Sequence, residues 1–134
     1  MDEADAVSHR PDLSILLYPV ATMADPHVHA GSRLELLGPT PTPEGIDRYS
    51  LERMGWTGRP PTFLLHAMDD EAVPVENSLQ LLATLRAAGV PAEAHLFQKG
   101  GHGFGIRLIE GRPAAVWPEL ALALAWAARH GFAG

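Results

Sequence analysis

Two short apolar runs constrain the fold of this chain more than any other feature. "LSILLYPV" (13–20) and "PTFLLHAM" (61–68) are almost continuously apolar and are bordered by proline. Runs of this length and character predict strands that are buried on both faces, as in a parallel sheet. A third run, "AEAHLFQ" (92–98), alternates more strongly and predicts a strand nearer to the sheet edge.

A helix is expected between the second and third strands, in "VPVENSLQLLATLRAAGVP". Pro74 suits the first helical turn, and Gly89 followed by Pro91 should end the helix. Its apolar stripe comprises Leu79, Leu82 and Leu85, with Leu81 and Ala88. Strand, helix and strand over this length form a βαβ unit, whose crossover should be right-handed.

The last segment, "AAVWPELALALAWAARH" (114–130), predicts a second helix with Pro118 in its first turn. The residues expected to face the sheet are Trp117, Leu120, Leu124 and Ala127. Together these elements predict an α/β fold for residues 1–134 as a single partial domain. Its sheet should be small, mostly parallel and of about three strands, with helices on both faces.

Residues 21–59 have a different composition, rich in Pro, Gly, Thr and His. Short helical pieces are expected near Ser32–Leu37 and Pro43–Arg53. A connection this long is typical of a lid, a binding loop or a disordered insertion, and we expect a cap-like or lid-like insertion between strands. Trp56 and Trp117 are interpreted as core or cap packing rather than as ligand contacts.

Composition excludes several classes of protein. The formal net charge of −6 and the lack of a basic patch argue against a nucleic-acid partner. No apolar run reaches the ~18–20 residues that span a bilayer, so no membrane partner is expected. The start, MDEADAVSHRPD, lacks the apolar stretch of a signal peptide, which favours a cytoplasmic location. The absence of cysteine excludes disulfides and thiolate chemistry.

Chemistry-bearing residues follow two of the predicted strands. "HAMDDEAVP" places Asp69 and Asp70 after one strand, and "GGHGF" places His102 after the next. Neighbouring parallel strands lie about 5 Å apart, so the two loops should emerge side by side. An aspartate can then accept the Nδ1 proton of His102 and leave Nε2 free as a base. The other aspartate could serve the dipole of the following helix.

The stretch "PPTFLLHAMDDEAVPVENSLQLLATLRAAGVPAEAHLFQKGGHGFG" resembles the carboxyl-terminal half of α/β-hydrolase-fold esterases. It is most similar to the acetyl esterase and acetylxylan esterase-like group, which is related to dienelactone hydrolases. "RPDLSILLYPV" and "HAGSRLELLGPTPTPEGIDRYS" extend the resemblance from about Ala6 to the end. It implies that Asp70, in Asp-x-x-Val-Pro, is the triad acid and His102 the triad histidine, with Asp69 as the alternative acid.

The resemblance also implies hydrolysis of small acyl esters, including those of acetylated carbohydrate, without a metal or organic cofactor. Residues 21–59 would then form a cap or a wall of the substrate pocket. The fold's nucleophile belongs in a Gly-x-Ser-x-Gly elbow before the acid, and its oxyanion loop lies earlier still. Neither motif occurs here, although the chain contains five serines: Ser8, Ser14, Ser32, Ser50 and Ser78.

An α/β hydrolase domain runs to roughly 250 residues, so this chain would be about half of one. Either the chain acts as an esterase of this family, or it is a truncated or split product that is inactive alone. In the second case an amino-terminal fragment would complement it. The strand at 13–18 would lack its outer neighbour, and its apolar edge should favour self-association or that fragment.

Several other residues have ordinary explanations. His27 and His29, with Asp25, could ligate a metal, but this pattern is weak. His66 at the end of a buried strand should be a core histidine with satisfied partners, and His95 should face solvent. Ser32, the one candidate for a substitute nucleophile, is better explained as the amino-terminal cap of a helix over residues 33–37.

Overall fold

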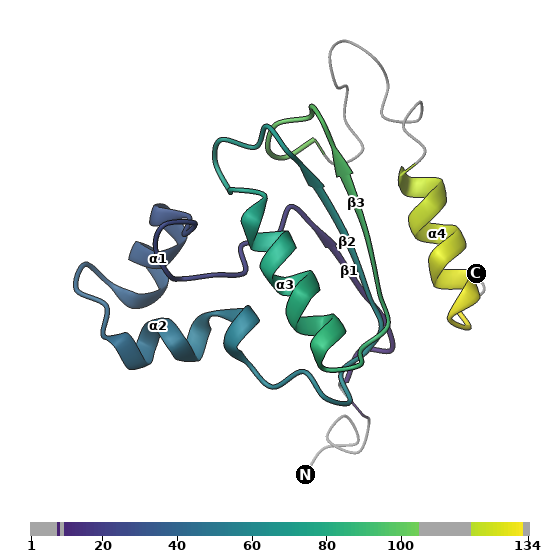
Figure 1. Ribbon diagram of the computed structural model, residues 1–134, viewed down its shortest axis with the longest axis horizontal. Coiled ribbons are helices and arrows are strands. Elements are labelled where there is room, and N and C mark those ends of the chain that lie inside the picture. The colour runs from purple at the N-terminus through teal and green to yellow at the C-terminus, as the bar shows by residue number, and fades with distance from the viewer. Residues whose placement is uncertain (1–7, 9, 105–118, 133–134) are drawn as a thin grey trace.

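The computed structural model describes Ser8, residues 10–104 and residues 119–132, without the side chains of residues 119 and 120. The elements in chain order are β1 (Ser14–Leu17), α1 (Ala30–Leu37), α2 (Pro43–Tyr49), the 3-10 helix η2 (Leu51–Arg53), β2 (Thr62–Ala67), α3 (Glu76–Ala87), β3 (Ala92–Phe97) and α4 (Glu119–Arg129). Each predicted strand and helix is present among the described residues (Figure 1).

The three strands form one parallel sheet in the order β1-β2-β3. All six residues of the central strand β2 are buried, whereas β1 alternates between half-buried and exposed residues. Ala67 at the end of β2 lies opposite Phe97 at the end of β3. Because the strands are parallel, the loops that follow β2 and β3 leave the sheet at the same edge, as Figure 1 shows.

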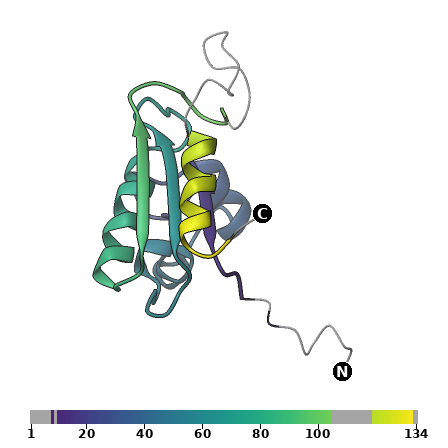
Figure 2. The ribbon, with the colours of Figure 1, turned by 90° about the vertical axis from the view of Figure 1, so that its right-hand side faces the viewer.

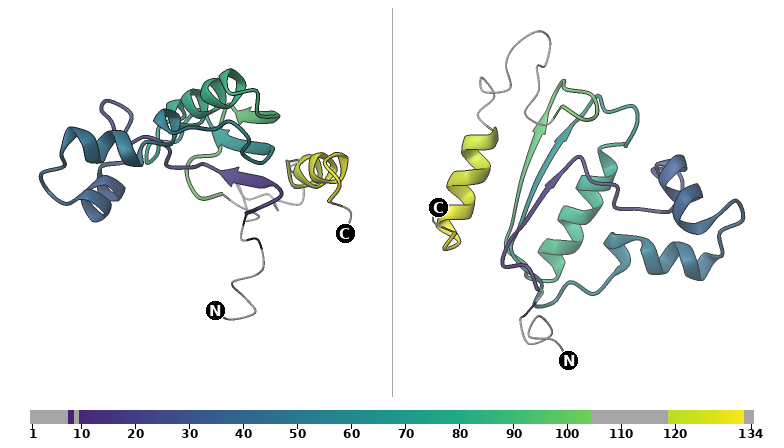
Figure 3. Two further views of the ribbon diagram at one scale, coloured as in Figure 1. Left: turned by 90° about the horizontal axis from the view of Figure 1, so that it is seen from below. Right: turned by 180° about the vertical axis from the view of Figure 1, so that it is seen from behind.

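Helices cover both faces of the sheet, as the sequence predicts. On one face α3 packs through Leu81 and Leu85 against Leu64 of β2. On the other face α4 packs through Trp126 against Phe63, with ring centroids 5.6 Å apart. Figures 2 and 3 show α3 and α4 on opposite sides of the strands. The α/β architecture is therefore confirmed.

The buried face of α3 differs from the predicted leucine stripe. The helix buries Asn77, Ser78, Leu81 and Leu85, and Leu79 is 41% exposed. The prediction for Leu79 was wrong because two polar residues, which form internal hydrogen bonds, occupy the inward positions of the first turn. Pro74 lies before the helix rather than within its first turn.

The predicted end of α3 is confirmed. Gly89 has a φ of +68°, a conformation that glycine adopts without a side-chain clash. The Gly89 amide donates to Arg86 O and the Val90 amide to Leu85 O, at 3.1 and 3.0 Å. These two bonds form a Schellman motif, and the buried side chain of Val90 provides the apolar contact that commonly accompanies it.

The last helix also differs in register from its predicted face. Ala123, Trp126 and Ala127 are buried at i, i+3 and i+4 spacing, whereas Leu124 is 60% exposed. Leu124 was wrongly predicted to face the sheet, because it lies two residues from Trp126 and thus on another side of the helix. The side chains predicted for positions 117 and 120 lie outside the described residues.

The connection between β1 and β2 contains α1, α2 and η2, which lie beside the sheet rather than over its α4 face (Figure 1). The predicted helical pieces are thus confirmed. The cap of α1 is His29, whose Nδ1 accepts the Ser32 amide at 3.2 Å. The assignment of Ser32 as the cap was wrong: Ser32 lies within the helix, and its hydroxyl contacts His29 Nδ1 at 2.8 Å. Trp56 packs against the α3-side core, as expected.

Strand β1 lies at an edge of the described sheet and pairs with β2 alone. Leu16 packs toward α3, so Ile15 and Leu17 point to the opposite face, where they are 43% and 40% exposed. This apolar, incompletely covered edge agrees with the expectation for residues 13–18. No helix in the described part of the chain is long and apolar enough to cross a membrane.

Candidate active site

The loops after β2 and β3 bring an acid and a histidine into contact. Asp70 Oδ2 lies 2.8 Å from His102 Nδ1. The Asp70 side chain is fully buried, whereas the His102 side chain is 38% exposed. Asp70, and not Asp69, therefore contacts the imidazole. Among the described residues, none forms a hydrogen bond with His102 Nε2.

The Asp70 carboxylate is held by its own loop. Its Oδ1 accepts the amides of Ala72 and Val73 at 3.0 and 2.8 Å, which is the geometry of an aspartate that closes a turn. Burial raises the pKa of Asp70, but the Val73 amide, His102 and the Ala72 amide together lower that pKa below its ordinary value. The carboxyl is therefore an anion that accepts a hydrogen bond from Nδ1–H of His102.

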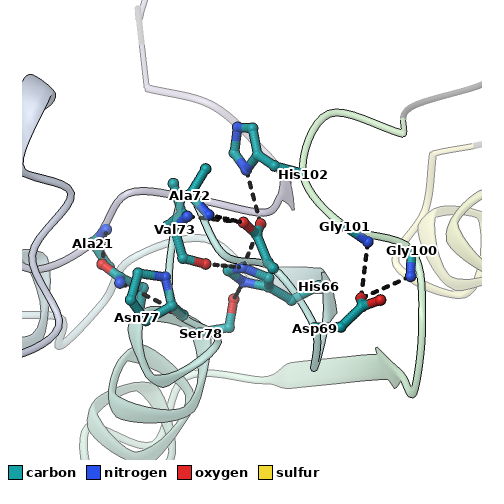
Figure 4. Close-up of polar contacts among 12 residues, drawn as sticks. Ala21, His66, Asp69, Ala72, Val73, Asn77, Ser78, Gly100, Gly101 and His102 are labelled. Carbon is teal, nitrogen blue, oxygen red and sulfur yellow. Dashed lines mark hydrogen bonds and ion pairs between the residues drawn. The ribbon is translucent and has the colours of Figure 1, made fainter.

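A second imidazole touches the same carboxylate from inside the protein. His66, fully buried on β2, has its Nε2 3.2 Å from Asp70 Oδ2 and 2.9 Å from Val73 O. Both partners only accept hydrogen bonds, so Nε2 carries the proton. In the neutral ring Nδ1 then accepts from the Ser78 hydroxyl at 2.7 Å, and Figure 4 shows this contact.

The prediction that His66 is a satisfied core histidine is confirmed, but its contact with the candidate site was missed. A signal was present in the sequence. His66 precedes Asp70 by four residues, at the end of a strand whose following loop carries the acid. A turn closed by Asp70 folds back over the strand end, so a side chain at that position can reach the carboxylate.

Asp69 has a different set of contacts. Its Oδ1 accepts the backbone amides of Gly100 and Gly101 at 2.8 and 2.9 Å, as Figure 4 shows. It does not cap α3, which begins at Glu76. The suggestion that the second aspartate serves the helix dipole is therefore wrong. The described contacts of Asp69 are with the loop that carries His102.

Tyr18, which follows β1, completes the surroundings of His102 and was not singled out by sequence reasoning. Its ring meets the His102 ring edge-on at a centroid distance of 4.8 Å, and the Phe104 ring at 5.2 Å. Its φ of +38° is unusual for a residue with a side chain and costs of order 1–3 kcal/mol. The Tyr18 amide donates to Leu65 O at 2.6 Å, which fixes this turn beside the sheet.

The remaining candidates lie apart from this pair. Asp25 forms an ion pair with Arg33 at 2.9 Å, and His27 Nδ1 lies 3.7 Å from Glu76. His29, as described above, caps α1. Within the described part of the chain, no group of three or more His, Cys, Asp or Glu side chains could hold a metal ion.

His95 is half-buried rather than solvent-facing, which corrects the prediction. Its ring stacks on Phe63 at 5.2 Å, because its side of β3 faces the partly covered α4 layer. Its Nε2 contacts Glu93 at 2.9 Å. This hydrogen bond from His95, with the charge of Arg129 on α4, lowers the pKa of Glu93 although partial burial opposes the shift. This group ties β3 to α4 and is separate from the Asp70–His102 pair.

The hydroxyls of three serines have partners elsewhere. Ser32 contacts His29, Ser78 contacts His66, and Ser50 donates to Ile46 O at 2.7 Å. None of the described serines is hydrogen-bonded to His102.

Comparison with known proteins extends this picture. Residues 22–130 match the prolyl oligopeptidase family. The chain is 39% identical over 100 residues to endo-1,4-β-xylanase B of Butyrivibrio fibrisolvens and 35% identical over 100 residues to an acetylxylan esterase of Xylanibacter ruminicola. These matches cover 75% and 72% of this chain, but 16% and 21% of the two relatives.

A solved structure shares the fold closely. The acetyl ester-xyloside bifunctional hydrolase of Caldicellulosiruptor lactoaceticus superimposes with a TM-score of 0.88 and 38% identity, over 99% of this chain and 47% of that protein. The chain thus spans less than half the length of each of these three proteins. Its parallel strands and flanking helices form part of an α/β-hydrolase fold, and the expected resemblance to esterases is confirmed. The chain belongs to the prolyl oligopeptidase family.

Proposed function

We propose that this chain provides the acid and the base of a serine-type carboxylic ester hydrolase for small acyl esters, including acetylated carbohydrate. The observation that carries the proposal is the 2.8 Å contact between Asp70 Oδ2 and His102 Nδ1 on a partly exposed ring. The substrate class is supported by two relatives, whose names are acetylxylan esterase and acetyl ester-xyloside bifunctional hydrolase.

In the proposed mechanism the Asp70 carboxylate accepts a hydrogen bond from Nδ1–H of His102, which keeps the proton on Nδ1 and leaves Nε2 bare. As a serine oxygen attacks the ester carbonyl, Nε2 takes the serine proton and then gives it to the departing alcohol oxygen. In the second half of the reaction Nε2 removes a proton from the water that attacks the acyl-serine ester, and it returns that proton to the departing serine oxygen as the acid is released. In each step this chain contributes proton transfer by His102 and charge stabilisation by Asp70.

The nucleophile must come from another segment, because no Gly-x-Ser-x-Gly occurs in the 134 residues. We therefore also propose that these residues alone are inactive and act with an amino-terminal segment of the fold. The bare edge of β1, with Ile15 and Leu17 exposed, is the proposed contact for that segment, which would add a strand beside β1. Residues 21–59 are proposed to form a cap or pocket wall.

Complementation tests both parts of this proposal. The chain is co-expressed with the segment of the Caldicellulosiruptor hydrolase that lies outside the matched 47%. Turnover of p-nitrophenyl acetate is then measured for the copurified complex and for the chain alone. We expect turnover by the complex, and equal background rates for the wild-type chain and His102→Ala when each is alone.

In the complex, His102→Ala and Asp70→Asn should each lower kcat by roughly 10³-fold or more, because a triad without one member keeps only residual catalysis. His130→Ala is the matched control, since His130 is also exposed, directly follows α4 and lies outside residues 21–59. A complex that forms but hydrolyses the ester equally well with His102→Ala would contradict the proposed role of His102.

A further inference from the structure

Two adjacent carboxylates at the end of β2 contact the same neighbouring loop in two different ways. Asp70 contacts the His102 ring, whereas Asp69 Oδ1 accepts two successive backbone amides just before it, those of Gly100 and Gly101. The proposed mechanism uses Asp70 and leaves Asp69 without a role. Its contacts, however, are with Gly100 and Gly101, and Gly101 directly precedes the proposed base, His102.

The backbone of this loop is shaped so that both amides can converge on one oxygen. Gly101 has a φ of +61°, a left-handed conformation, and successive amides in such turns form an anion-binding concavity. At Gly100, a Cβ would lie 3.1 Å from the Cβ of Ala67 and 3.3 Å from the Phe104 ring. The loop therefore lies directly against the end of β2, and a side chain at position 100 would require Ala67 or Phe104 to shift by a few tenths of an ångström.

We propose that Asp69 is a positioning residue that holds the backbone of the His102 loop, so that Nδ1 of the ring meets Asp70. The Gly101–His102 peptide directly follows the two bonded amides, so fixing those amides fixes the direction in which the His102 side chain leaves the chain. A charged acceptor makes these bonds stronger than neutral ones. Beyond the loop, the buried ring of Phe104 anchors its other end.

This inference deepens the proposed function, because it concerns the same acid–base pair, but its test requires no ester turnover. Asp69→Asn and Asp69→Ala both remove the charge, and only Asp69→Asn keeps an oxygen acceptor in the same place. A difference between the two variants therefore reports the hydrogen bonds and not the charge. Glu71→Ala is the control for loss of an exposed acidic side chain from the same loop.

Amide hydrogen exchange of Gly100 and Gly101 is measured by NMR in all variants. Loss of hydrogen bonds to a charged acceptor should accelerate exchange of both amides by about tenfold in Asp69→Ala. Exchange in Asp69→Asn should lie between wild type and Asp69→Ala, because the neutral amide oxygen is a weaker acceptor than the carboxylate. Exchange in Glu71→Ala should match wild type.

The second readout is the hydrogen bond between His102 and Asp70. In Asp69→Ala the Nδ1–H signal of His102 should broaden or disappear through exchange with water, and the pKa of Asp70 should be higher than in Asp69→Asn. Unchanged glycine exchange in Asp69→Ala, or faster exchange with an intact Nδ1–H signal, would overturn the positioning role. Either result would leave the proposed function standing. An inactive complemented enzyme with all these signals intact would instead overturn the proposed function alone.

Discussion

Replacement of His66 by leucine removes the inner imidazole from the network that holds Asp70. Leucine is close to histidine in volume, so the packing change is small, and the cost comes from the polar partners. Ser78 Oγ and Val73 O lose their hydrogen bonds of 2.7 and 2.9 Å, and both residues are only 1% exposed. Asp70 Oδ2 keeps His102 but loses its second donor.

A buried polar group left without a partner costs about 1–3 kcal/mol, so two of them should cost about 2–6 kcal/mol in the free energy of unfolding. Domains are commonly stable by only about 5–15 kcal/mol, which makes this loss readily measurable. Urea unfolding of the full chain, followed by the fluorescence of buried Trp126, measures it.

A double-mutant cycle separates the network from packing. Ser78→Ala alone leaves His66 Nδ1 without its donor, and we expect a cost of about 1–3 kcal/mol. In the double variant His66→Leu with Ser78→Ala the orphaned hydroxyl no longer exists, so the total should be about 0.5–3 kcal/mol less than the sum of the single losses. Additive losses, or a His66→Leu variant within about 0.5 kcal/mol of wild type, would refute the reasoning.

Three further predictions concern the acid, α4 and the inserted segment. Folding lowers the pKa of Asp70, so the carboxylate contributes fully to stability above its ordinary pKa of about 4. This contribution is lost as the pH falls through the pKa of the folded state. Asp70→Asn should therefore destabilise the protein at pH 7, and the difference in unfolding free energy from wild type should close below about pH 4 in urea titrations. Trp126→Ala should cost about 3–5 kcal/mol, whereas Leu124→Ala, 60% exposed, should lie within about 0.5 kcal/mol of wild type in thermal melts; equal losses would contradict the observed register of α4. Asn77→Ala should speed amide exchange at Ala21 and Thr22, whose amides both donate to Asn77 Oδ1 at 2.9 Å, and unchanged exchange there would count against this anchor.

The strands could be predicted from sequence because burial on both faces requires nearly continuous apolar runs. The faces of the helices could not, since hydrophobicity alone did not show that Asn77 and Ser78 turn inward to satisfy buried polar groups. Leu79 and Leu124 were misplaced for this kind of reason: a leucine-rich helix offers several apolar faces, and the tertiary contacts choose among them.

The Asp70–His102 contact was within reach of the sequence, because parallel neighbouring strands place their following loops at one edge. Which of Asp69 and Asp70 contacts His102 could not be predicted, since it depends on the turn in which Asp70 accepts the Ala72 and Val73 amides. The contact between Tyr18 and His102 could not be predicted from the sequence either. It follows from a positive φ and from the approach of two loops far apart in sequence.

The most direct test of the central claim is the tautomer of the His102 ring, read from the ¹⁵N shifts of its two nitrogens in the neutral form. Donation from Nδ1 to Asp70 at 2.8 Å predicts a proton on Nδ1 and a bare Nε2 available as a base. Asp70→Asn should remove the preference for the tautomer with the proton on Nδ1, because the asparagine amide can also donate to Nδ1. A neutral wild-type ring that carries its proton on Nε2 would contradict the account.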